Sequence, residues 1–216
     1  MKVLQILPEL NIGGVERGTL DLSKALVQKG HKSYVISNGG KLEASLIASG
    51  GNHISMPIHL KRFKTLKLAD DLFKIIKEIN PDIVHVRSRM PAWVTYRALK
   101  KFKKNKPIHV STFHGLYSFP IYSKVMAQVD HIISISKTVE DYIKTTYQVA
   151  ANKITVIPRG CDLNEFNEEP LTSEWKFDWY QEFPHTKNKR ILTLPARITK
   201  WKGVDDFIEL ISLIDN

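Results

Sequence analysis

With 216 residues, the chain exceeds one domain of the usual size, about 100–150 residues, and falls short of two large ones. Its 43% hydrophobic content supports a core, and its net charge of +10 favours an anionic partner such as a nucleotide, an acidic membrane surface or a nucleic acid. The N-terminal apolar run is too short for a signal peptide, no segment reaches the ~18 apolar residues of a membrane span, and the single cysteine, Cys161, excludes an internal disulfide, so we expect a cytoplasmic protein.

Apolar segments alternate with amphipathic ones along most of the chain. Strands are predicted at 3–7, 33–37, 54–56, 83–86, 108–113, 132–135 and 154–157, and helices at 15–29, 42–49, 65–79, 91–101 and 136–147. Strands joined by helices in this way form right-handed crossovers. The predicted fold class is therefore α/β, with a doubly wound parallel sheet that binds ligands at the carboxyl ends of its strands.

The pattern changes after residue 163. Residues 1–163 hold the alternating strands and helices, whereas 164–189 mix acidic and aromatic residues and are predicted to connect two domains. The aromatic side chains are too many for a free linker, so we expect this connector to pack on the first domain, with a short helix that begins at Thr172 or Ser173. Residues 190–216 contain one further strand, at 191–194, and one amphipathic helix.

Two strand ends of the first domain carry candidate binding residues. After the first strand, Gly13 and Gly14 let the backbone approach a ligand at the start of a helix, with Arg17 in its first turn. After the strand at 108–113, His114 precedes Gly115, which leaves room for a ligand beside the imidazole. A structural interpretation stays open for both: glycines that only relieve a tight turn, and a histidine without a ligand.

A third candidate lies between the last predicted strand and helix. Arg197 and Lys202, followed by Gly203, place cations and an open backbone near a helix N-terminus, where unpaired N–H groups favour an anion such as a diphosphate. Each charge-assisted hydrogen bond contributes about 1.5–3 kcal/mol. On these residues alone, a solvated basic loop is an equal alternative.

Several enzyme signatures are missing from the sequence. No two glycines are separated by one residue, which excludes the dinucleotide fingerprint, and the P-loop spacing from Gly13 to Gly18 is followed by Thr19 rather than lysine. There is no His-Glu-x-x-His or Gly-x-Ser-x-Gly, and the eight histidines are scattered. We therefore expect no cofactor and no metal, and a structural role for His85 at the end of a buried strand.

Together, the strand-end residues resemble the family 4 glycosyltransferases, whose GT-B fold consists of two Rossmann-like domains that face each other across a cleft. The matching elements follow the order of the family: Gly13-Gly14-Val15-Glu16-Arg17, Gly30-His31, Pro81-Asp82-Ile83-Val84-His85, Thr112-Phe113-His114-Gly115, Ser134 to Ser136, Ile157-Pro158-Arg159-Gly160, Asp162, Phe166, and Arg197 through Lys202-Gly203. On this resemblance, residues 1–163 form a Rossmann-like acceptor-side domain. Residues 190–216 form the first strand and helix of a truncated donor-binding domain, since the family's Glu-x7-Glu element has no counterpart after Lys202.

The resemblance implies transfer of a sugar from a nucleotide-diphosphate sugar, with retention of configuration and without a metal. The acceptor would be a glycan or lipid-linked precursor, as in the synthesis of cell-envelope polysaccharide or lipopolysaccharide. Arg197 and Lys202 would offset charge on the leaving diphosphate, and His114 would contact the transferred sugar. The expected catalytic residues are His114, Arg197 and Lys202, and the expected donor-binding residues are Gly13, Gly14, Arg17, Gly115, Asp162 and Gly203.

Two basic stretches are candidates for contact with a membrane or an acceptor. The first contains Lys61, Arg62, Phe63 and Lys64, and the second contains Lys100, Lys101, Lys103 and Lys104 around Phe102. Cations interleaved with phenylalanine are typical of interfacial segments, so we expect peripheral contact with the inner face of a membrane. A solvated helix face is the alternative for each stretch.

Three function classes remain. The first is a glycosyltransferase that acts once another polypeptide supplies the missing C-terminal half; the second is a non-catalytic acceptor-binding subunit or inactive gene remnant. The third, a nucleic-acid-binding module, is weakest because the lysine runs contain no recognisable reading motif, so no nucleic-acid partner is expected. Residues 190–216 should be the least stable part, because one strand and one helix cannot bury a core.

Overall fold

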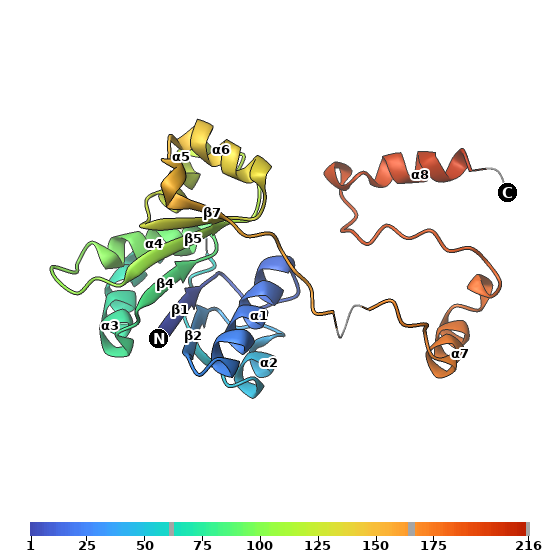
Figure 1. The fold of residues 1–216 in the computed structure, drawn as a ribbon, viewed down its shortest axis with the longest axis horizontal. Helices are drawn as coiled ribbons and strands as arrows, with labels where there is room; N and C mark the ends of the chain where they lie inside the picture. Colours follow the sequence, from blue (N-terminus) through green and yellow to red (C-terminus); the bar gives the residue numbers. More distant parts are fainter. Residues whose placement is uncertain (61–62, 164–166, 215–216) are drawn as a thin grey trace. The chain divides into compact units, whose positions relative to one another are not determined.

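The first unit of the chain, Met1–Gly160, is built on one sheet of parallel strands (Figure 1). The structure, a computed structural model, describes residues 1–60, 63–163 and 167–214. The strands are β1 (Lys2–Ile6), β2 (Lys32–Ser37), β3 (Asn52–Ser55), β4 (Ile83–Val86), β5 (Ile108–Phe113), β6 (His131–Ser134) and β7 (Ile154–Val156), in the order β3-β2-β1-β4-β5-β6-β7. The order changes direction between β1 and β4, and open α/β sheets bind ligands at such a switch point. The predicted fold class, a Rossmann-like doubly wound parallel sheet, is confirmed.

Helices cover both faces of this sheet. They are α1 (Gly14–Gln28), α2 (Glu43–Ala48), α3 (Ala69–Ile79), α4 (Arg89–Leu99), α5 (Pro120–Ser123) and α6 (Lys137–Tyr147), with 3-10 turns η1 (Phe63–Leu68), η2 (Lys124–Ala127) and η3 (Ala151–Lys153). Successive side chains of a strand point to opposite faces. In β2, Val35 accordingly packs in one apolar cluster with Leu46 of α2, whereas Ile36 packs in a larger one with Leu72 of α3. The sheet is therefore buried on both sides, and its strand ends remain for binding.

The predicted elements differ from these mainly at their ends. The helix predicted at 65–79 is a 3-10 turn, η1, followed by α3, and α4 begins at Arg89 rather than at Pro91. Two short elements after β5, α5 and η2, were not predicted from the sequence. Within the described ranges, no helix is long and apolar enough to cross a membrane.

The second unit, Cys161–Asn216, contains α7 (Ser173–Glu182), the 3-10 turns η4 (Pro184–Thr186) and η5 (Lys200–Lys202), and α8 (Val204–Ser212). The side chain of Thr172 accepts a hydrogen bond from the amide of Trp175 (3.1 Å) and caps α7, which confirms the predicted helix start. The aromatic side chains of this helix pack on one another, since the rings of Trp175 and Trp179 are stacked 5.3 Å apart.

The strand predicted at 191–194 is wrong. These residues have no regular secondary structure, and Ile191 and Leu192 are about half exposed. A strand requires a neighbour for its backbone hydrogen bonds, and among residues 167–214 no other segment pairs with it. An apolar run of this kind favours burial, but it does not show that a partner strand is present.

Candidate functional site

The loop after β1 leads directly into α1 without a side-chain cap. Gly13 occupies the N-cap position, and a Cβ atom on Gly14 would have no neighbouring atom within 4 Å, so the space beside the first turn is open. Unpaired amides and the helix dipole favour an anion there. The predicted ligand residue Arg17 forms an ion pair with Asp21 on α1, with 3.0 Å between Nε and Oδ1.

A chain of polar contacts fixes this loop from the neighbouring strands. The amide of Leu10 donates to the carbonyl of Gly39 (2.8 Å), and the amide of Gly39 donates to Oγ of Ser37 (3.0 Å). Oγ of Ser37 lies 2.8 Å from Nε2 of His53, whose Nδ1 lies 3.0 Å from Oε1 of Glu43. These groups have the order of a Ser-His-acid triad, but Ser37 is fully buried and cannot reach a substrate. Their role is to hold the loop in position.

Arg87 follows β4 at the switch point and was not predicted as a site residue. It is only 6% exposed, its amide donates to the carbonyl of Ile6 (3.0 Å), and its Nη1 donates to Oε1 of Gln5 on β1 (3.0 Å). Gln5 is itself fully buried and donates through Nε2 to the carbonyl of Thr19 in α1 (3.1 Å). Burial, assisted by the charge of Arg159, lowers the pKa of Arg87 to about 10. The guanidinium therefore stays charged at neutral pH, beside the strand ends.

His114 lies directly after β5. Burial lowers its pKa to about 3, and the positive charges of Arg87 and Arg159 act in the same direction. Its Nε2 is buried and has no hydrogen-bond partner among the residues that the structure describes. A Cβ on the following Gly115 would meet no atom within 4 Å. The imidazole is therefore neutral at physiological pH, next to open space.

The other histidine at this sheet edge is structural, as predicted. Nε2 of His85 lies 2.7 Å from Oγ1 of Thr112 on the adjacent strand, and the side chain is buried. Burial and the charge of Arg87 hold the pKa of His85 well below its usual range. This contact joins β4 to β5 just before Arg87 and His114.

Arg159 comes from the segment after β7 and reaches back to α1. Its Nη2 donates to the carbonyl of Gly14. A Cβ on Gly18 would lie only 2.7 Å from the same nitrogen, so the missing side chain of Gly18 allows the guanidinium to lie against the helix. From the sequence, Arg159 was one residue of a family motif and had no predicted role.

The structure thus brings together the predicted residues Gly14 and His114 with two arginines that were not predicted. Each arginine lies within electrostatic reach of the other and of the imidazole, because each changes the pKa of its neighbours. A charged residue that directly follows a buried strand was the available signal for Arg87. Across the described parts of the chain, no group of three or more His, Cys, Asp or Glu residues is arranged to hold a metal ion.

The remaining donor-side candidates belong to the second unit. Gly203 has φ of +71°, the left-handed region that favours glycine, and it forms the N-cap of α8. Lys202 ends η5 immediately before it, and the carbonyl of Arg197 accepts from Oγ1 of Thr199 (3.4 Å). Asp162 lies in the same unit. The catalytic roles of Arg197 and Lys202, and the donor-binding roles of Asp162 and Gly203, stay predictions.

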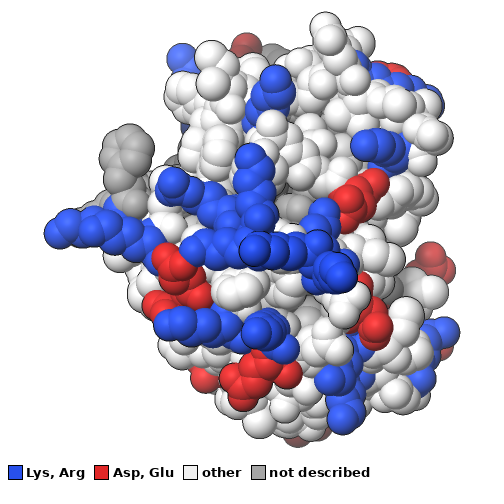
Figure 2. Space-filling model, turned by 90° about the vertical axis from the view of Figure 1, so that its left-hand side faces the viewer, with Lys and Arg blue, Asp and Glu red and all other residues white. Residues whose placement is uncertain are grey.

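Figure 2 shows Lys and Arg side chains gathered across the side of the molecule on which α3 and α4 lie in Figure 1. The exposed lysines of η1, α3 and the segment after α4 are Lys64, Lys67, Lys74, Lys77, Lys100, Lys101, Lys103, Lys104 and Lys106. Lys101 pairs with Asp70, and Nζ of Lys100 lies 4.5 Å from the ring centroid of Tyr96. The predicted membrane residues Lys61 and Arg62 lie outside the described residues.

The role expected for Phe102 in this basic stretch needs correction. Its ring packs edge-on against Phe73 of α3, with 4.9 Å between centroids, and is partly buried against the core. It therefore anchors the end of α4 to α3 and is not an exposed interfacial side chain. Any attraction of this face to a membrane comes from its lysines.

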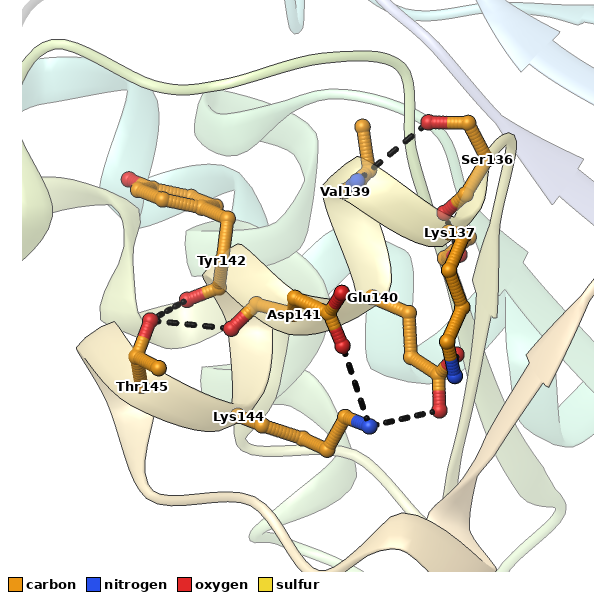
Figure 3. Close-up of polar contacts among 9 residues, drawn as sticks. Ser136, Lys137, Val139, Glu140, Asp141, Tyr142, Lys144 and Thr145 are labelled. Atoms are coloured by element: carbon orange, nitrogen blue, oxygen red, sulfur yellow. Dashed lines mark hydrogen bonds and ion pairs between the residues drawn. The ribbon is translucent and has the colours of Figure 1, made fainter.

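The end of β6 leads into α6 through a side-chain cap at Ser136 (Figure 3). Oγ of Ser136 accepts a hydrogen bond from the amide of Val139 (3.2 Å). Glu140 pairs with Nζ of Lys137 (2.6 Å) and of Lys144 (3.0 Å), and hydrogen bonds from these two lysines lower the pKa of its carboxyl group. The first amides of α6 and the charge of Glu140 thus find their partners within the helix and its cap. The residues at the end of β6 therefore have a structural role in starting α6.

Comparisons with known proteins agree with this arrangement. Residues 12–165 match the model of a family described as Glycosyltransferase Family 4. A glycosyltransferase from Rickettsia africae ESF-5 has 35% sequence identity and a TM-score of 0.81, over 98% of this chain and 56% of that chain. Alr3699/HepE from Anabaena, solved in complex with UDP-glucose, is 15% identical with a TM-score of 0.79, over 100% of this chain and 58% of that chain. The fold is thus that of the GT-B glycosyltransferases.

A human relative, a subunit of the phosphatidylinositol N-acetylglucosaminyltransferase, is 24% identical over 182 residues. The match covers 74% of this chain and 36% of the human protein. The chain therefore spans little more than a third of that relative and 56% of the Rickettsia structure.

Proposed function

Because the chain belongs to glycosyltransferase family 4, we propose that it takes part in transfer of a sugar from a nucleotide-diphosphate sugar to a glycan or lipid-linked acceptor. In this reaction the bond from the anomeric carbon to the diphosphate breaks, and a bond to an acceptor hydroxyl forms. The nucleoside diphosphate and the hydroxyl proton leave. The observation that supports the proposal is the cluster of Gly14, Arg87, His114 and Arg159 at the switch point of the sheet.

In this proposal His114 hydrogen-bonds the transferred sugar and is not a general acid. A histidine with a pKa of about 3 is almost entirely neutral at pH 7, so it has no proton to donate as an imidazolium. Its unpartnered Nε2 is instead suited to a neutral hydrogen bond with a sugar hydroxyl, beside the open space at Gly115. The proposed role is orientation of the sugar over the acceptor.

The donor diphosphate is proposed to bind at the N-terminus of α1. Gly13 and Gly14 would supply backbone N–H groups, while Arg197 and Lys202 would offset the charge on the leaving group. Fixed cations of this kind replace the metal ion that other transferases use, which is why we propose a metal-independent reaction. Retention of configuration, and donor contacts from Arg17, Gly115, Asp162 and Gly203, are part of the same proposal.

A non-catalytic acceptor-binding subunit, or an inactive remnant, is the second candidate. Either candidate has to account for the apolar side chains that α8 exposes, among them Ile208 (63%) and Leu210 (55%). Exposed apolar side chains on one helix indicate that further protein covers them. We propose that the active form includes a C-terminal half that covers α8 and supplies the donor's nucleotide site, in the same or another polypeptide.

Donor turnover tests these alternatives. The purified chain is incubated with UDP-glucose and with other UDP-, GDP- and ADP-sugars, with and without a membrane-lipid extract as acceptor, and release of the nucleoside diphosphate is measured. When a C-terminal half is present, in the same or an added polypeptide, we expect release that depends on the extract, falls about 100-fold in His114→Ala, and is unchanged in Arg97→Gln on the far end of α4. Acceptor binding without donor binding or turnover would favour the non-catalytic subunit.

The basic face in Figure 2 supports a cytoplasmic protein that binds the inner face of a membrane. Each lysine near an anionic surface contributes about 1 kcal/mol at low salt. We expect sedimentation with phosphatidylglycerol vesicles, and not with phosphatidylcholine vesicles, to weaken in the double variant Lys103→Glu/Lys104→Glu. Lys24→Glu/Lys29→Glu, with the same charge change at exposed positions of α1 and its C-cap, is the control. Equal binding by both double variants would contradict a specific role for this face.

A further inference from the structure

Two arginines from different strand ends converge on the N-terminal end of α1. Arg87 donates from Nη1 to Gln5, while its Nε has no partner in the described part of the chain. Arg159 donates to the carbonyl of Gly14 and is otherwise exposed. Like charges repel, so this convergence costs free energy unless an anion lies between or beside them.

The surrounding acids do not neutralise this pair. Glu16 and Asp21 are close enough to influence Arg87, but among the described residues neither guanidinium has a carboxylate within the 4.0 Å of an ion pair. Asp21 is already paired with Arg17. The two positive charges are therefore uncompensated within this unit.

The backbone beside the two arginines leaves room for a ligand. A Cβ atom on Gly14, Gly115 or Gly160 would meet no atom within 4 Å. These glycines follow β1, β5 and β7, so the open positions lie along one edge of the sheet, at the ends of strands on both sides of β4. His114 adds an unpartnered buried nitrogen at the same edge. A charged and a neutral hydrogen-bonding group thus face the edge where parallel sheets bind ligands.

We propose that Arg87 and Arg159 form a binding site for an anionic group, a phosphate or a carboxylate, of the sugar acceptor. This rests on the proposed function and on the acceptor-side role expected of residues 1–163, because both arginines lie in the first unit, Met1–Gly160. Planar guanidinium groups suit both oxyanions, because each can accept two parallel N–H bonds. The acceptor is accordingly an acidic or phosphorylated sugar and not a neutral one.

Binding of small probes to the full chain tests this without any transfer reaction. Glucose 6-phosphate, glucuronate and glucose share one ring and differ in charge, and their affinities are measured by titration calorimetry at constant ionic strength. We expect the two charged sugars to bind and glucose to bind at least tenfold more weakly. The charged probe with the higher affinity identifies the acceptor's group as phosphate or carboxylate.

Variants assign the binding to the two arginines. Arg87→Gln and Arg159→Gln should each lower the affinity for the charged probes at least tenfold. Arg97→Gln removes the same charge from the exposed side of α4 and should leave the affinity unchanged. If Arg87→Gln fails to fold, Arg159→Gln decides, because Arg159 is exposed and outside the core. Unchanged affinity in Arg159→Gln, or equal affinity for charged and neutral sugars, overturns the proposal.

A competition experiment separates the acceptor from the donor. Saturating UDP should leave the affinity for glucose 6-phosphate unchanged, whereas displacement by UDP would assign the arginines to the donor diphosphate and overturn the proposal. Charged probes that bind as expected, in a chain that turns over no donor, would refute the proposed transfer reaction and leave the anion site intact. The two proposals therefore fail separately.

Discussion

Replacing Gly18 by alanine should displace Arg159 while leaving the stability of the fold nearly unchanged. Gly18 lies within α1, where alanine favours the helix by about 0.8–1 kcal/mol over glycine. The new Cβ, however, would lie 2.7 Å from Nη2 and 2.9 Å from Cζ of Arg159. Atoms do not approach so closely, so the guanidinium has to move, and it can because it is the end of an exposed, flexible side chain.

The magnitude follows from two opposing terms. Moving the guanidinium breaks its hydrogen bond to the carbonyl of Gly14, which contributes about 0.5–1.5 kcal/mol. Because the bond is exposed, the lower part of that range applies, and the gain in helix propensity offsets it. The free energy of unfolding should therefore change by less than about 0.5 kcal/mol. Affinity for glucose 6-phosphate should nevertheless fall about tenfold, since one of the two cations is displaced.

A double-mutant cycle with Arg159→Ala isolates the cause. In that background no guanidinium is present, so Gly18→Ala should stabilise the chain by about 1 kcal/mol in urea unfolding and leave probe affinity unchanged. If Gly18→Ala binds glucose 6-phosphate as tightly as the unmodified chain, the contact between Gly18 and Arg159 has no role in the site. A loss of stability above about 1.5 kcal/mol would show that the backbone of α1, and not the side chain, has moved.

Three further predictions concern the fold. Burial lowers the pKa of His109 to about 4, below its usual 6.5, so protonation opposes folding and stability is lost as the pH falls from 6.5 towards 4. The buried His85 and His114 contribute in the same direction, so His109→Gln should reduce the loss of stability between pH 7 and pH 5 by about 2 kcal/mol in urea unfolding without abolishing it. Ser136→Ala removes the cap of α6 and should cost about 1 kcal/mol, whereas Thr138→Ala, exposed in the same turn, should cost almost nothing. Gly40 has φ of +146° and its Cβ would lie 2.5 Å from the carbonyl carbon of Leu10, so Gly40→Ala should destabilise the chain by roughly 2–4 kcal/mol in the same assay.

The sheet could be predicted because each strand is an apolar run between helices, but its boundaries could not. The strand predicted from Ser33 begins at Lys32, because Lys32 pairs with Lys2 across the ladder. Backbone pairing does not depend on hydrophobicity, so polar residues extend a strand without any signal in the pattern. The four residues of α5 are too few to show helical periodicity.

The site was only partly predictable for a related reason. Gly14 and His114 belong to short motifs, whereas Arg87 and Arg159 are separated by 72 positions in sequence and meet only because β4 and β7 end at the same edge of the sheet. The strand order determines which ends are adjacent, and an isolated arginine does not reveal its neighbours. Gln5 was an available signal for a polar neighbour, since a polar residue inside a buried strand requires a hydrogen-bond partner.

Arg87 is a destabilising residue at this position unless a ligand binds it. Burial lowers its pKa to about 10 on folding, which corresponds to about 3 kcal/mol against the charged form. Gln5 accepts one hydrogen bond from the guanidinium, and Nε of Arg87 has no acceptor among the described residues. A bound oxyanion would supply both the acceptor and the opposite charge, and at 100 times its Kd it would stabilise the native state by about 2.7 kcal/mol. Phosphate should therefore raise the Tm above that in chloride at equal ionic strength, and the difference should disappear in Arg87→Gln. Equal Tm values in the two salts would mean that the buried charge serves only to join β1 to β4.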